Sequence, residues 1–123
     1  MSTILVIDDE KGILRLMHQA LTKFGHNVET ADDGLEGIRK FDDGCFDIVI
    51  TDIRMPVIDG NGVVAHIRKS EKQSIPVIAI SGTPWLLGSD NFDMVLPNPF
   101  SLKKFIESIR SLAPVPPRAA MGT

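Results

Sequence analysis

Acidic residues that follow two apolar segments are the first candidates for chemistry. Asp8, Asp9 and Glu10 come directly after Ile4–Ile7, and Asp52 comes after a second such segment. Two unit charges about 4 Å apart repel by roughly 4 kcal/mol at an effective dielectric near 20, so grouped carboxylates need a compensating cation. Oxygen ligands of this type suit a hard divalent ion, and magnesium is the cofactor we expect.

A simpler role is open for Asp8 and Asp9. Acidic residues after a strand also cap the following helix, where the helix dipole favours them.

Two further residues favour a binding site. Ser81 ends another apolar segment and Gly82 follows it, so a hydroxyl donor lies beside a residue with no side chain to block approach. Such a pair suits a phosphoryl oxygen.

Two dipeptides, Met55-Pro56 and Asp59-Gly60, predict a turn between Asp52 and the next helix. Proline and glycine are expected to supply the backbone angles of that turn. The acidic residues, Ser81-Gly82 and this turn form a combination that is more specific than any of its members.

The elements that must position these residues alternate along the chain. Three short segments rich in β-branched residues indicate buried parallel strands, at 4–7, 46–50 and 76–80, and 27–31 is a weaker strand suited to a sheet edge. Apolar residues recur at helical spacing, and each set predicts one buried helix face. The sets are Ile13, Leu14, Met17, Leu21 and Phe24; Leu35, Ile38 and Phe41; Val63, Val64 and Ile67; and Leu102, Phe105, Ile106, Ile109 and Leu112. Gly25 is placed to end the first helix in a left-handed conformation.

This alternation predicts an α/β fold, a doubly wound five-stranded parallel sheet with helices on both faces. If the strand order is the flavodoxin-like 2-1-3-4-5, the first and third strands are neighbours. Asp8, Asp9 and Asp52 then converge at the carboxyl ends of the strands, where such sheets bind ligands.

The composition fits one domain. The chain has 123 residues, 43% of them hydrophobic, and we expect a domain over 1–113 followed by a proline-rich flexible tail or linker start over 114–123. A net charge of −3 argues against direct nucleic-acid binding. The single cysteine, Cys45, forms no internal disulfide, and no leader or long apolar run indicates export or a membrane. A cytoplasmic location is expected.

From Ile4 to about Leu112 the chain resembles the receiver domain of two-component response regulators. The matching motifs are Val6-Ile7-Asp8-Asp9-Glu10, the eleven residues from Ile50 to Gly60, the seven from Pro76 to Gly82, and Pro99-Phe100. The resemblance implies a signalling domain rather than an enzyme. Its partners would be a histidine kinase or phosphotransfer protein and a downstream effector protein.

The resemblance also implies a role for each residue of the cluster. Asp52 would be the nucleophile that accepts the phosphoryl group. Asp9 and Asp52 would bind magnesium directly, together with the backbone carbonyl of Arg54, and Asp8 would orient bound water. Ser81 would hydrogen-bond the phosphoryl group and report its presence.

The chain departs from the family pattern at three places. Asn98 occupies the position of a lysine that supplies positive charge, and a neutral amide is a weaker partner for phosphoryl oxygens. Arg54, or Lys103 and Lys104, would have to replace that charge. Val95 stands where the family has an aromatic switch residue. Only sixteen residues separate Ser81 from Asn98, so the fourth helix is expected to be short or missing.

Two other functions compete with the receiver. A phosphorylation-independent docking module needs only the fold and an exposed patch. A magnesium-dependent phosphohydrolase of the haloacid dehalogenase type is weaker, because it needs two aspartates one residue apart and a lysine, whereas Asp8 and Asp9 are adjacent. Four large apolar residues, Trp85, Leu86, Leu87 and Phe92, predict a patch for homodimerisation or partner docking, or else a seal over the core.

Overall fold

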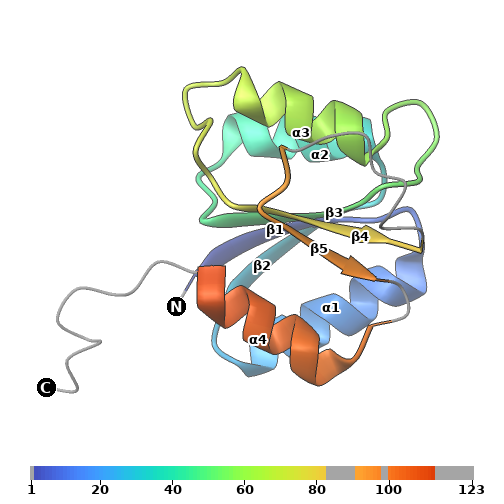
Figure 1. Ribbon diagram of the computed structural model, residues 1–123, viewed down its shortest axis with the longest axis vertical. Helices are drawn as coiled ribbons and strands as arrows, with labels where there is room; N and C mark the ends of the chain where they lie inside the picture. Colours follow the sequence, from blue (N-terminus) through green and yellow to red (C-terminus); the bar gives the residue numbers. More distant parts are fainter. Residues whose placement is uncertain (1, 83–90, 98–99, 113–123) are drawn as a thin grey trace, which may run out of the picture.

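The computed structural model describes residues 2–82, 91–97 and 100–112. Five strands form one parallel sheet in the order β2-β1-β3-β4-β5 (Figure 1). Their bounds are β1 (Thr3–Ile7), β2 (Asn27–Ala31), β3 (Ile48–Asp52), β4 (Val77–Ser81) and β5 (Met94–Pro97). The predicted doubly wound, flavodoxin-like order is therefore confirmed.

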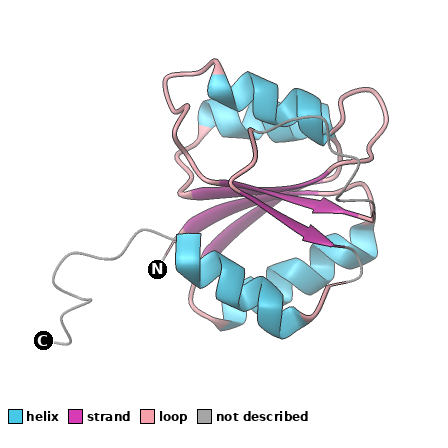
Figure 2. Ribbon diagram, viewed as in Figure 1, coloured by secondary structure: helices cyan, strands magenta, loops and turns pink. Residues whose placement is uncertain are grey.

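Four helices in the described part of the chain cover the two faces of this sheet. Helices α1 (Lys11–Lys23) and α4 (Leu102–Leu112) lie on one face, and α2 (Gly34–Asp43) and α3 (Gly60–Arg68) lie on the other (Figures 1 and 2). The longest of them, α1, has 13 residues, whereas a helix needs about 20 to cross a bilayer.

The core has two halves because successive side chains of a strand point to opposite faces. In β1, Ile4 and Val6 pack on the side of α1 and α4, and Leu5 and Ile7 pack on the side of α2 and α3. All four are completely buried. This two-sided burial explains why the central strands have continuous apolar sequences.

Two predictions about local structure are confirmed. Strand β2 lies at the sheet edge and alternates in exposure, with only Ala31 buried. Gly25 has φ of 90° and follows the C-terminal end of α1, where its N–H donates to the carbonyl of Thr22. The N–H of His26 donates to the carbonyl of Leu21, which satisfies another carbonyl of the last turn.

Three residues predicted on buried helix faces are instead exposed: Phe24, Leu35 and Leu102. Phe24 is the C-terminal cap of α1, and Leu35 and Leu102 belong to the first turns of α2 and α4. The buried members of each set lie nearer the middle of the helices. Apolar spacing alone does not show where a helix passes beyond the surface that it covers.

Several predictions concern residues outside the described segments. These are the short or missing fourth helix, the patch at Trp85, Leu86 and Leu87, and the tail over 114–123. Phe92 is described, and it is partly buried against the core half formed with α2 and α3. This one member of the predicted patch therefore packs on the core.

Candidate functional site

The structure brings Asp8, Asp9 and Asp52 together at the carboxyl ends of β1 and β3. One carboxylate oxygen of each lies within 4.8 Å of those of the other two. The strands pair in parallel with Ile7 opposite Thr51, so the residues that follow in each strand emerge side by side. An all-oxygen set of this size matches the ligands that Mg²⁺ prefers.

The three carboxylates differ in their surroundings. Asp8 is only 4% exposed, and its Oδ1 accepts a hydrogen bond of 2.9 Å from the N–H of Glu10. Asp9 is exposed and Asp52 is partly buried. The N-cap residue of α1 is Glu10, and its side chain makes no capping hydrogen bond. Helix capping therefore does not account for the cluster.

Burial and mutual repulsion perturb two of these groups. The pKa of Asp8 is raised from 3.8 to about 7, first by burial and then by the charges of Asp52, Asp9 and Glu10, against the opposing hydrogen bond from Glu10 N–H. The pKa of Asp52 is also raised, by burial and by Asp9, while the N–H groups of Ile53 and Arg54 act in the opposite direction. A bound cation would favour the ionised form of both groups.

The cluster opens into a pocket of about 340 Å³. Its lining residues come from the ends of three neighbouring strands: Asp9, Glu10, Asp52, Ile53, Arg54, Ser81 and Gly82. Ser81 is the last residue of β4 and is 5% exposed, and Asp52 pairs with Ile80 of the same strand. The pocket therefore brings carboxylates, a hydroxyl and the exposed backbone of Gly82 next to one another.

Among the described residues, Arg54 is the one cationic residue that lines this pocket. Lys103 and Lys104 are exposed on α4, and neither lines it. Asn98 lies outside the described residues, directly after Pro97, which pairs with Ser81. Val95 is partly buried within β5.

The loop from Asp52 to α3 differs from the prediction in how it turns. The residue with a positive φ is Val57, at 70°, and its side chain is 96% exposed. Gly60 is needed for space instead, because a Cβ there would lie 2.6 Å from the carbonyl oxygen of Asp52. Asp59 caps α3 by accepting a hydrogen bond of 2.9 Å from the N–H of Gly62. The sequence signal for a turn was right, but the assignment of its angles to glycine was wrong.

Thr51 is a site residue that the sequence analysis did not single out. It is completely buried, and its hydroxyl donates a hydrogen bond of 2.9 Å to the carbonyl oxygen of Asp52. In the sequence, a hydroxyl-bearing residue at the end of the apolar segment Ile48–Ile50 is the feature that could have indicated this role. This contact holds the backbone of Asp52 from the side of the core.

Comparison with known proteins agrees with this geometry. The family described as the response regulator receiver domain matches residues 4–84. The chain belongs to this family. The transcriptional regulatory protein TcrA of Mycobacterium tuberculosis is 33% identical over 97% of the chain. The chain spans about half the length of TcrA, with 51% of it covered.

Two solved structures extend the comparison. The response regulator TrrA of Thermotoga maritima, in complex with Mg²⁺ and BeF, has a TM-score of 0.84 and 34% identity, and the match covers 91% of this chain and 99% of that one. TrrA in complex with the histidine kinase ThkA has a TM-score of 0.80 and 32% identity, with 91% and 98% covered. TrrA, a response regulator similar to this chain, is thus found in complex with Mg²⁺ and BeF and in complex with a histidine kinase.

Proposed function

We propose that Asp52 accepts a phosphoryl group from a histidine kinase or phosphotransfer protein in a magnesium-dependent reaction. The observation that carries the proposal is the position of Asp52, at the end of the central strand and with the oxygens of Asp8 and Asp9 within 4.8 Å. The complexes of TrrA with ThkA and with Mg²⁺ and BeF support it by similarity.

The chemistry requires a carboxylate and no general base. An Oδ of Asp52 attacks the phosphorus of a phosphohistidine, an O–P bond forms, and the N–P bond breaks with its electron pair returning to the imidazole. The product is an aspartyl phosphate on Asp52. Magnesium, when bound, neutralises the carboxylates and the transferred group.

Each neighbour of Asp52 has a proposed task. Asp9 and Asp52 would hold the metal together with the backbone carbonyl of Arg54, and Asp8 would orient a water molecule at the site. The Ser81 hydroxyl donates a hydrogen bond to a phosphoryl oxygen, and Gly82 leaves the approach open. With the neutral Asn98 in place of a lysine, we expect the phosphoryl oxygens to be held more weakly than in a charge-assisted contact.

The output of the domain is proposed to be a protein contact rather than catalysis on a released substrate. The net charge of −3 is unfavourable for direct binding to nucleic acid, so a downstream effector protein would read the phosphorylated state. We also propose a cytoplasmic location for the domain.

The test is the intact mass of the protein after incubation with acetyl phosphate and Mg²⁺. The wild type should gain the mass of one phosphoryl group, and neither Asp52→Asn nor the wild type with EDTA should gain it. Absence of the adduct from the wild type would contradict the proposal and favour a docking module. Sustained turnover of phosphomonoesters would contradict it in favour of a phosphohydrolase.

A further inference from the structure

Helices α1 and α4 lie on the same face of the sheet (Figure 1). A groove of about 480 Å³ is lined by residues from both helices and from the end of α1. We call it the α1–α4 groove. Its apolar lining consists of Ala20 and Phe24 from the α1 side and Leu102 and Ile106 from α4. None of these residues lines the pocket at Asp52, so the groove is a separate feature of the domain.

The apolar lining is open to solvent. Phe24 is 52% exposed and Leu102 is 45% exposed, and Ile106 is partly buried beside them. Both exposed residues belong to helical patterns that predicted burial. Exposed apolar surface that gathers in one groove is typical of a binding surface, whereas scattered single residues are ordinary.

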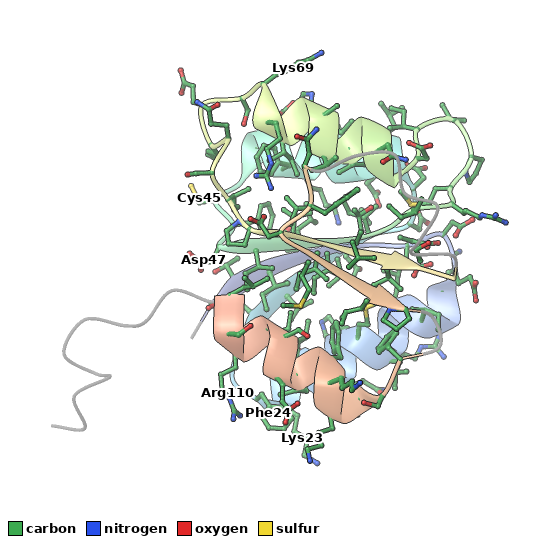
Figure 3. All side chains as sticks on the ribbon, in the orientation of Figure 1. Lys23, Phe24, Cys45, Asp47, Lys69 and Arg110 are labelled. Carbon is green, nitrogen blue, oxygen red and sulfur yellow. The ribbon has the colours of Figure 1, made fainter. Side chains whose placement is uncertain are left out.

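The polar residues of the groove are mostly basic. Lys23, Lys103 and Arg110 line it together with one acidic residue, Glu107, which gives a local charge of +2 on a chain whose net charge is −3. Figure 3 shows Lys23, Phe24 and Arg110 close together at this edge of the molecule. Within the described segments, none of the four charged side chains forms a hydrogen bond or an ion pair. Their charges are available to a partner.

We propose that the α1–α4 groove docks an amphipathic helix of a partner protein, with apolar side chains in the groove and Asp or Glu residues on its flanks. A helix laid in an apolar groove is a common mode of peptide recognition. The cationic rim complements acidic flanks and disfavours basic ones. Charges at the rim act over about 8 Å at physiological salt, so this local positive potential counts more than the distant acidic residues.

Two other occupants fit less well. A nucleic acid would use the cations but leave Phe24 and Leu102 without apolar partners. A second copy of this chain, related by a two-fold axis through the groove, would bring Lys103 and Arg110 of both copies to one interface. Like charges placed together in that way oppose self-association.

The test uses the full 123-residue chain and two synthetic helical peptides with the same leucine pattern, one flanked by Glu and the other by Lys. Amide chemical shifts report where each peptide binds. The Glu peptide should shift residues 20–24 and 102–110, and it should bind more weakly as salt is raised. The Lys peptide should bind at least about tenfold more weakly.

Matched variants locate the effect. Lys103→Glu should lower the affinity for the Glu peptide and raise the affinity for the Lys peptide. Phe24→Ser should lower the affinity for both peptides without lowering the melting temperature of the protein. Lys69→Glu makes the same charge change beyond the end of α3, in the opposite helix layer, and should change neither affinity (Figure 3).

Four results would overturn the proposal. They are no shifts in the groove with the Glu peptide, equal affinity for both peptides, equal effects of Lys103→Glu and Lys69→Glu, and concentration-dependent shifts of the groove without peptide. The last result would identify a second copy as the occupant. None of these measurements depends on phosphorylation of Asp52.

Discussion

Gly60 packs directly against the backbone of Asp52. A Cβ at position 60 would lie 2.6 Å from the carbonyl oxygen of Asp52 and 2.9 Å from the Cα of Ile53. The N–H of Gly60 also donates a hydrogen bond of 2.9 Å to the carbonyl of Ile53. The first residue of α3 is therefore in contact with the strand end that carries the proposed phosphoacceptor.

Gly60→Ala should lower the free energy of unfolding by about 1–3 kcal/mol, because the methyl group forces the backbone of Asp52 or α3 to move. Phosphorylation by acetyl phosphate should slow as well, since Asp52 would be displaced. Gly12→Ala is the matched control, because a Cβ there meets nothing within 4 Å. It should leave stability unchanged or raise it by about 0.5–1 kcal/mol. Equal unfolding curves for the two variants would contradict the close contact.

The raised pKa of Asp8 predicts a pH-dependent stability of the metal-free protein. A carboxyl with a pKa of about 7 in the folded state and 3.8 in the unfolded state binds its proton more tightly when folded. Its contribution to the free energy of unfolding therefore falls as pH rises between these values, and it levels off above about 7. Asp52 acts in the same direction.

Asp8→Asn should remove this contribution and stabilise the metal-free protein at about pH 8, on the order of 1–2 kcal/mol. The measurement is the difference in free energy of unfolding between wild type and variant as a function of pH, with EDTA present. A difference that stays constant from about pH 4 to pH 8 would show that Asp8 is not perturbed in the folded state.

Millimolar Mg²⁺ should raise the melting temperature of the wild type, because a bound cation removes the repulsion within the acidic cluster. The shift should be larger at about pH 8 than at about pH 5, where protons compete with the metal for Asp8. Asp9→Ala should abolish it. An equal shift in Asp9→Ala, or none in the wild type, would rule out a magnesium site at these residues.

Arg68 connects the last turn of α3 to the segments before β4 and β5. It donates hydrogen bonds to the carbonyls of Gln73, Ile75 and Asn91 and to the carboxylate of Asp93. Arg68→Ala should lower the free energy of unfolding by about 1–3 kcal/mol, because the carbonyls of Gln73 and Ile75 lose this donor, while Asp93 keeps the hydrogen bond from the N–H of Val77. Arg39→Ala is the control, since that side chain is 69% exposed and only 3.9 Å from Glu36. The free energy of unfolding of this control variant, measured by chemical denaturation, should fall by less than about 0.5 kcal/mol.

The sequence was sufficient to predict strands β1 to β4 and the acidic cluster from local patterns, whereas no apolar pattern marked the segment of β5. Apolar β-branched segments indicate buried strands, and parallel strands bring their carboxyl ends to one edge, so the meeting of Asp8, Asp9 and Asp52 could be expected. The position of β2 at the sheet edge followed from the alternation over Asn27–Ala31 in the same way.

Features that depend on distances between elements could not be predicted. The space available at Gly60 is determined by how α3 packs on β3. The exposure of Phe24 and Leu102 is determined by how far α1 and α4 extend past the surface that they cover. The positive φ of Val57 runs against the preference of a β-branched residue, so no sequence rule favours it. The α1–α4 groove was missed for the same reason, because its residues fit the helical patterns of a buried face.

The most direct measurement is the location of the phosphoryl group. After incubation with acetyl phosphate and Mg²⁺, borohydride reduces an aspartyl phosphate to homoserine, and tandem mass spectrometry of peptides identifies the converted position. The proposed function predicts homoserine at position 52, and none in a sample treated with EDTA. Conversion at position 8 or 9, or an unconverted Asp52 in a protein that carries phosphate, would contradict it.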